Sequence, residues 1–303
     1  MLGWVFTAIA IAVSVVIAAL LGYAIWRRRL PPAADVERNP GEGLRWIGIG
    51  TGISTVILLA MAVYALLVLG QVGRPPATPA LTIHVTGYDW WWRADYLDAA
   101  DGTARFGAAP VAFSTANEIH IPVGQPVRLL LDSADVIHAF WVPQLAGKTQ
   151  MIPGLTNQQW LQADAAGVYR GQCTQFCGVQ HAHMAFEVVA DEPAAYQRWL
   201  KAQQQPASAA LLPALTGGRT LFMDRCAGCH TLRGTPADGN HGPDLTHLAS
   251  RRQIAAGLMD NTPANLMNWI THAQTLKPGS RMPSIALDAT ETRDLSTFLA
   301  SLQ

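Results

Sequence analysis

The chain has 303 residues, a formal net charge of zero and a hydrophobic content of 50%. That length is enough for more than one domain, and a neutral chain lacks the basic excess of nucleic-acid-binding proteins, so we expect no nucleic-acid partner. Four cysteines are too few for a disulfide scaffold. All four lie in two close pairs, Cys173 with Cys177 and Cys226 with Cys229, and this pairing favours cofactor chemistry.

Two uncharged apolar runs open the chain, at residues 1–26 and 46–73. Each exceeds the about 20 residues that a helix needs to cross a bilayer. A cleaved signal peptide carries positive charge before its apolar run, whereas here no basic residue precedes the first run. We therefore interpret it as a retained helix. The sequence predicts a two-helix transmembrane hairpin over residues 1–74, with helices at about 2–26 and 46–72.

Arginines gather in the loop between the two runs. They are Arg27, Arg28, Arg29, Arg38 and Arg45. The positive-inside rule places such a loop in the cytoplasm. Everything after residue 74 is then expected on the outer, periplasmic face of the membrane.

Residues 81–198 carry short alternating segments separated by Gly and Pro turns, such as 118–123 and 127–131 around Gly124-Gln125-Pro126. This spacing is typical of an all-β sandwich or barrel. A loop rich in Cys, His and Met, at residues 173–184, joins two late strands at one end of the predicted sandwich. Loops held on a rigid scaffold are where sites usually lie.

The loop combines thiol, imidazole and thioether side chains, the soft and borderline ligands that suit copper. It runs Cys173-Thr-Gln-Phe-Cys177-Gly-Val-Gln-His181-Ala-His183-Met184. Two thiolates four residues apart can bridge a pair of metal ions. Such a pair needs a second imidazole from elsewhere in the chain, and His138 is the best candidate.

Other interpretations explain fewer of the residues in this loop. A Cys173–Cys177 disulfide suits an oxidising compartment but leaves the His and Met residues unexplained. Zinc is disfavoured because structural zinc sites use Cys and His. His183 competes with His181, and the three-residue gap after Cys177 favours His181. We interpret His84 and His120 as structural.

A second metal motif, Cys226-Ala-Gly-Cys229-His230, has the C-x-x-C-H spacing of covalent c-type haem attachment. The two sulfurs would bond to the haem vinyl groups, and His230 would ligate the iron. Residues 199–216 are rich in Gln, Ala and Pro and predict a linker, whereas residues 217–303 show helical periodicity. A copper-type loop and a haem motif in one chain point most simply to an electron-transfer protein.

The loop, Asp135-Val-Ile-His138, residues 147–154 and the aromatic run Trp90-Trp91-Trp92 together resemble subunit II of cytochrome c oxidase, over residues 1–200. This resemblance implies a cupredoxin-like Greek-key sandwich and a binuclear copper centre, CuA. The ligands it implies are His138, Cys173, the backbone carbonyl of Gln175, Cys177, His181 and Met184.

Two further features follow from that resemblance. Trp90 matches the aromatic residue through which members accept electrons. Three consecutive Trp side chains cannot all point inward on a strand, so we expect at least one to be exposed; packing is the alternative role for Trp90. Many members carry Glu where this chain has Gln175. A neutral amide is a weaker ligand for a hard cation, which weakens the case for the family's magnesium ion at the interface with subunit I.

Residues 217–303 resemble a small class I cytochrome c, an all-α domain. The resemblance implies that Met282, in Met282-Pro283, ligates the iron opposite His230, an arrangement that raises the haem potential. It also implies that Gly242-Pro243 orients His230. The remaining Met and His residues are assigned to the core or are weaker alternatives: Met259, Met267, His241, His247 and His272.

A subunit II fused to a cytochrome c resembles the caa-type terminal oxidases. It implies that a soluble or membrane cytochrome c, or a quinol–cytochrome c reductase, donates electrons to the haem c. They would continue through CuA to haem a in subunit I, where the haem–copper centre reduces oxygen to water with proton translocation. Subunit III would complete the complex in the bacterial cytoplasmic (inner) membrane. A fused donor has a high local concentration, so its docking need not be tight.

Two other functions stay open. The first is the electron-input subunit of a CuA-containing nitric oxide reductase, which only the neighbouring catalytic subunit would distinguish. The second is a membrane-tethered copper carrier, against which the C-x-x-C-H motif argues. Glu42 precedes the second apolar run, where an acidic residue of the family can load a proton channel. We interpret Glu42 as a solvated loop charge.

Overall fold

The computed structural model describes residues 2–27, 40–73, 77–79, 81–97, 110–207 and 213–303. The chain forms two compact units, Met1–Arg74 and Pro75–Gln303.

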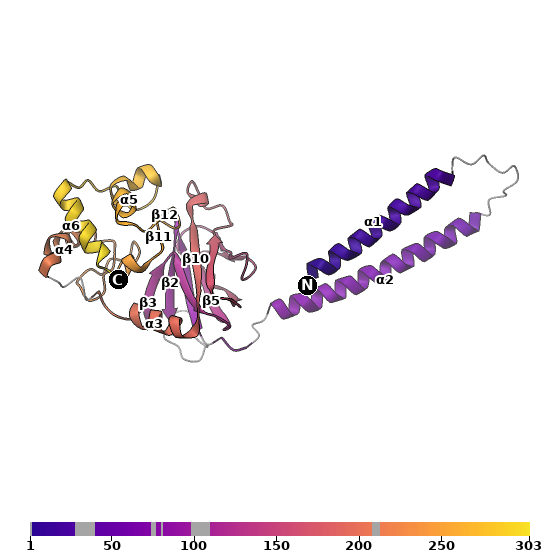
Figure 1. Cartoon of the computed structure of the whole chain (residues 1–303), viewed down its shortest axis with the longest axis horizontal. Coiled ribbons are helices and arrows are strands. Elements are labelled where there is room, and N and C mark those ends of the chain that lie inside the picture. Colours follow the sequence, from indigo (N-terminus) through magenta and orange to yellow (C-terminus); the bar gives the residue numbers. More distant parts are fainter. Residues whose placement is uncertain (1, 28–39, 74–76, 80, 98–109, 208–212) are drawn as a thin grey trace. The chain divides into compact units, whose positions relative to one another are not determined.

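The first unit consists of two long helices, α1 (Leu2–Arg27) and α2 (Pro40–Val72) (Figure 1). Both are long and apolar enough to cross a membrane. Their large apolar side chains are exposed, Leu20 by 63% and Leu66 by 67%. So much exposed apolar surface fits a lipid or protein surrounding better than water.

The second helix begins before the uncharged run, at Pro40, a residue suited to the first turn of a helix. Glu42 therefore lies in the first turn of α2. Its side chain is outside the described residues, as are Arg28, Arg29 and Arg38 of the loop on which the predicted orientation rests.

The second unit opens with a sandwich of two sheets, one with the strand order β3-β2-β1-β5-β8 and the other β4-β10-β9. A short hairpin pairs β6 with β7. The strands are β1 (Leu81–Tyr88), β2 (Trp91–Leu97), β3 (Val111–Ala116), β4 (Glu118–Pro122), β5 (Val127–Ser133), β6 (His138–Phe140), β7 (Thr149–Met151), β8 (Asn157–Leu161), β9 (Gly167–Gln172) and β10 (Ala185–Asp191). The inward side chains form one core that includes Val85, Leu129, Phe140, Phe186 and Val188.

The ends of β6, β9 and β10 meet at one end of this sandwich. The Cys173 N–H donates to the carbonyl of Met184 (3.0 Å), and the Thr174 N–H donates to that of Ala139 (3.1 Å). These bonds fasten both ends of the residue 173–184 loop to the sheets. The sequence-predicted ligands are therefore held by a rigid scaffold.

The sandwich is followed by α3 (Pro193–Gln203), so the first part of the expected linker is helical. A helical domain then closes the chain. Its elements are η3 (Pro213–Leu215), α4 (Thr216–Arg225), η4 (Leu248–Ser250), β11 (Gln253–Ile254), β12 (Met259–Asp260), α5 (Pro263–Leu276) and α6 (Ala289–Ala300). Phe222 of α4 packs against Phe298 of α6 in its core. Two apolar helices, a β-sandwich and a helical domain confirm the predicted fold class.

Candidate metal centres

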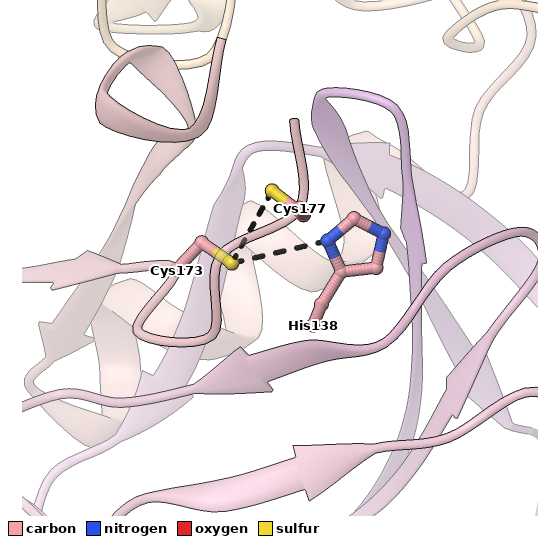
Figure 2. Close-up of side chains that lie close together, drawn as sticks. All are labelled: His138, Cys173 and Cys177. Atoms are coloured by element: carbon pink, nitrogen blue, oxygen red, sulfur yellow. Dashed lines mark hydrogen bonds between the residues drawn. The ribbon is translucent and has the colours of Figure 1, made fainter. Parts of the chain in front are cut away.

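The predicted copper ligands converge at the end of the sandwich, where Figure 2 shows Cys173, Cys177 and His138. The Cys173 Sγ lies 3.8 Å from the Cys177 Sγ and 3.8 Å from Nδ1 of His138. On the other side of the pair, the Cys177 Sγ lies 3.5 Å from Nδ1 of His181 and 3.8 Å from Sδ of Met184. Two sulfurs are thus flanked by an imidazole on each side, a donor set that fits a pair of copper ions.

The carbonyl of Gln175 completes the predicted set, with its oxygen 3.3 Å from the Cys173 Sγ. His183 points elsewhere: its Nδ1 lies 2.8 Å from Oε1 of Gln180. The structure therefore brings His181, and not His183, to the thiols.

The cluster is buried, with His138 and Met184 both 0% exposed and Cys173 1% exposed. Cys173 and Cys177 are free thiols. Their 3.8 Å separation is far beyond the about 2.05 Å of a disulfide bond. The structure thus has the thiol pair that metal binding needs.

The buried thiols and the imidazole of His138 shift one another's pKa values. Hydrogen bonding from the Cys177 thiol, with a contribution from His138, lowers the pKa of Cys173 to about 4. Burial pulls the pKa of His138 down, but the Asp135 carboxylate and Cys173 outweigh it and raise that pKa to about 9. These shifts favour a thiolate on Cys173 and a protonated His138, and a metal ion would bind there by displacing protons.

Asp135 is a functional residue to which the sequence pattern gave no role. Its Oδ1 lies 2.9 Å from Nε2 of His138, which leaves Nδ1 of the ring facing Cys173. Carboxylates commonly orient metal-binding histidines in this way. In the sequence, the signal that could have indicated this role is an acidic residue three positions before the predicted ligand His138. Gly87 supports the same ring, since a Cβ there would lie 2.8 Å from Cδ2 of His138.

Trp90 lies directly beside the copper-type cluster. Its indole Nε1 donates to the backbone carbonyl of Cys177 at 2.9 Å, and only 9% of the residue is exposed. Trp92 is buried as well, whereas Trp91 is half-buried and stacks on Tyr88 with ring centroids 4.7 Å apart. The most exposed member of the aromatic run is thus Trp91.

The haem motif lines an apolar cavity in the same unit. Cys226, Cys229, His230 and Met282 all border it. After α4 the chain turns tightly, because the N–H groups of Cys229 and His230 both donate to the Cys226 carbonyl at 3.0 Å. This turn brings both thiols and the imidazole to one wall of the cavity, as covalent haem attachment requires.

The segment predicted to orient His230 contacts it. Nδ1 of His230 lies 2.8 Å from the Pro243 carbonyl oxygen, which leaves Nε2 for a metal. A Cβ at Gly242 would lie 2.6 Å from Cε1 of the ring. Burial lowers the pKa of His230 and so favours the neutral ring, the form that ligates metals. These residues fit a haem iron.

The other sulfur and imidazole candidates have different surroundings. Met259 and Met267 pack in the hydrophobic core of the helical domain. Nε2 of His247 lies 3.0 Å from the Gln205 carbonyl oxygen, and Nδ1 of His272 lies 2.8 Å from the Thr271 hydroxyl. His241 borders the cavity beside the motif. Met282 is the predicted axial sulfur that the structure brings to the cavity.

Both metal centres meet at Trp90. Trp90 and Trp91 line the haem cavity, and the Trp90 indole also donates to Cys177. A soft-ligand cluster on a β-sandwich, a C-x-x-C-H motif at a cavity beside it and two apolar helices fit the class of membrane-anchored electron-transfer proteins.

Comparisons with known proteins agree with this class. The family model for the periplasmic domain of cytochrome c oxidase subunit II matches residues 81–191, and that for cytochrome c matches residues 215–303. Cytochrome c oxidase subunit 2 of Alkalihalophilus pseudofirmus is 31% identical over 299 residues, which are 96% of this chain and 82% of that protein. Its counterpart from Bacillus sp. PS3 is 27% identical over 274 residues, 84% of this chain and 73% of that protein.

Among solved structures, the periplasmic domain of subunit II of cytochrome oxidase from Bradyrhizobium japonicum is 31% identical, with a TM-score of 0.34; the match covers 44% of this chain and 96% of that one. The chain belongs to the cytochrome c oxidase subunit 2 family. It is therefore a subunit of an oxidoreductase complex. Residues 81–191 are called the copper domain below, and residues 215–303, which match cytochrome c, the haem domain.

Proposed function

We propose that this chain is the electron-input subunit of a caa-type cytochrome c oxidase. Electrons from an external cytochrome c or a quinol–cytochrome c reductase would enter at the covalent haem c, pass to CuA and continue to haem a in subunit I. Oxygen reduction and proton translocation would belong to the catalytic subunit.

The observation that carries this proposal is the position of Trp90. Trp90 borders the haem cavity, and its indole N–H donates to the carbonyl of Cys177 at 2.9 Å. The ring is close-packed on the copper loop, since a Cβ at Gly178 would lie 2.9 Å from Cζ2. The route from cavity to thiol therefore consists of one side chain, one hydrogen bond and the backbone of Cys177.

The residues that would hold the cofactors are those that the structure brings together. For CuA they are His138, Cys173, the Gln175 carbonyl, Cys177, His181 and Met184; for haem c they are Cys226 and Cys229 as thioethers and His230 and Met282 as axial ligands. Bound there, the two groups supply one-electron carriers of suitable potential. Gln175 offers only an amide to a magnesium ion at the subunit I interface, so magnesium is left out of this ligand set.

The surface of the copper loop suits a protein partner. Phe176 and Val179 are 74% and 78% exposed, and an exposed apolar pair beside a buried metal cluster favours an interface. We assign it to subunit I, with subunit III completing the complex. The two helices would lie in the bacterial cytoplasmic membrane, with the second unit on the periplasmic face.

The names of the relatives favour an oxidase over the two alternatives, a CuA-containing nitric oxide reductase and a membrane-tethered copper carrier. A carrier also has no use for a C-x-x-C-H motif that lines a cavity. Purification of the chain with its catalytic subunit distinguishes the two enzymes, because only the oxidase consumes oxygen with cytochrome c as donor.

The electron route is tested on the full chain, loaded with copper and haem. Its EPR spectrum should show one unpaired electron shared between two copper nuclei; a single-copper pattern would contradict the ligand set. Flash photoreduction of the haem should then be followed by copper reduction. Trp90→Phe removes the N–H donor, and we expect the rate to fall about tenfold. Trp160→Phe, on β8, is the control and should leave the rate unchanged.

A further inference from the structure

We propose that Lys277 and its neighbours fasten the haem domain onto the copper domain, so that the chain carries a seated electron donor instead of one that swings on a tether. The consequence for electron transfer rests on the proposed function; the docking itself does not.

Lys277 follows the last residue of α5, and its ammonium group is enclosed by three carbonyl oxygens. Nζ donates to Trp90 at 2.8 Å, to His183 at 2.7 Å and to Ala255 at 3.0 Å. An ammonium has three donors, so each has one acceptor. Two acceptors belong to the copper domain and one to the haem domain. The residue is 3% exposed, and a buried charge persists only where it is fully paired.

Two further hydrogen bonds join the same two surfaces. Nε2 of Gln180, in the copper loop, donates to the Pro278 carbonyl at 2.9 Å. The N–H of Ala185, at the start of β10, donates to the Ala256 carbonyl at 3.0 Å. Because Gln180 is itself buried, these are interior contacts of one packed interface.

An unfavourable backbone conformation supports the same contacts. Ala255 and Ala256 have φ values of 55° and 62°, in the left-handed region that disfavours residues with a Cβ. The carbonyl of Ala255 accepts from Lys277, and that of Ala256 accepts from Ala185. The turn is therefore bent so that two successive carbonyls each meet a donor at the interface.

Charged groups extend the interface at its edge. The Arg252 N–H donates to Oε2 of Glu118 at 2.9 Å, and its Nε lies 3.1 Å from Oε2 of Glu187. Both carboxylates belong to strands of the copper domain. Further along, Arg281 lies 3.5 Å from Asp135. Acids of the copper domain thus face arginines of the haem domain.

This interface covers the residue that an external donor would need. The Trp90 carbonyl is held by Lys277, and a Cβ at Gly279 would lie 3.6 Å from the tip of the Trp90 ring. A second cytochrome cannot contact this ring while the haem domain is seated, so it must deliver electrons to the haem domain. Loose tethering requires none of these paired, buried groups.

Lysine labelling of the full chain in detergent tests the docking directly. The chain has three lysines, Lys148, Lys201 and Lys277, and the first two are exposed. With a water-soluble acylating reagent and mass spectrometry, Lys277 should react at least about tenfold more slowly than the others, because reaction needs the interface to open. Labelling of Lys277 at a rate similar to the others would overturn the proposal.

A matched pair of variants extends this test. Arg252→Ala removes the Glu187 contact and should raise the rate of Lys277 labelling several-fold. Arg293→Ala, exposed on α6, should leave it unchanged. Equal labelling in the two variants would mean that the charged edge does not hold the domains together.

Electron-transfer kinetics supply the functional readout. In the wild-type chain the step from haem to copper should be independent of solvent viscosity. Lys277→Met should slow it and make it viscosity-dependent, while Lys201→Met should do neither. If the rate of this step in the wild-type chain depends on viscosity, the haem domain moves before each transfer and the proposed docking is wrong. If Lys277 is protected from labelling but no electron passes from haem to copper, the proposed function is refuted and the docking still stands.

Discussion

In the copper cluster the side chains contact one another, whereas the residues of the haem motif border a larger apolar cavity. His138 and Met184 are fully buried, but Cys229 is exposed and His230 is half-buried. Small ions need only a few converging donors, which a loop fastened to a sandwich can supply. A haem is large enough to form part of a domain's core. We therefore expect the protein fold to set the positions of the copper ligands, and the stability of the haem domain to depend on the group it binds.

The largest difference between the two sites is expected when haem attachment is prevented by the double substitution Cys226→Ala/Cys229→Ala. The contacts between the haem and its cavity exist only in the folded domain, and interactions confined to the folded state stabilise it, so we expect the haem domain to lose much of its stability. Region-resolved hydrogen exchange should show α4, α5 and α6 deprotected and the strands of the sandwich little changed.

Cys173→Ser is the corresponding change in the copper site. It should abolish the paired-copper EPR signal while amide protection of the sandwich persists, because most of its core consists of apolar side chains that are not predicted ligands. An equal loss of protection in both variants would remove the contrast between the two sites.

An intermediate effect is expected from the carboxylate that orients His138. Asp135→Asn keeps the shape of the side chain but loses its charge. Replacing such a partner of a metal ligand typically lowers metal affinity about 10–100-fold, and we expect copper affinity to fall within that range. Competition titration with a copper chelator measures it. Asp164→Asn, exposed after β8, is the control, and equal affinities in the two variants would mean that the packing around His138 suffices to orient it.

Sequence patterns predicted the parts of each site that lie close together along the chain. Cys173, Cys177, His181 and Met184 share one loop, and fixed spacing within a loop largely determines which groups meet. The C-x-x-C-H motif is local in the same way. His138 comes from a distant strand, and it was predicted because the loop needed a second imidazole.

The junction between the domains was not predictable in this way. Lys277 and Trp90 are 187 positions apart, and no periodicity or local motif links them. The sequence allowed a loosely docked donor and an exposed Trp in the aromatic run; the structure has a paired interface and a buried Trp90. Burial of Trp90 results from packing between two separate domains, information that the pattern of either domain alone does not contain.

The smallest and sharpest test compares two glycines that make room for the ligand histidines. A Cβ at Gly87 would lie 2.8 Å from the His138 ring, and one at Gly242 would lie 2.6 Å from the His230 ring. Distance alone predicts the larger penalty for Gly242→Ala. The surroundings predict the reverse, because His138 is 0% exposed and packed within the sandwich, whereas His230 is only half-buried.

Overpacking of a filled core typically costs about 1–3 kcal/mol, and we expect Gly87→Ala to fall in that range and Gly242→Ala below it. Hydrogen exchange of each domain in the full chain measures both losses. Gly147→Ala and Gly228→Ala are matched controls, since a Cβ at either position has nothing within 4 Å. A larger loss from Gly242→Ala would mean that the Pro243 contact holds His230 as firmly as the sandwich holds His138, and that the haem site is also set by the fold.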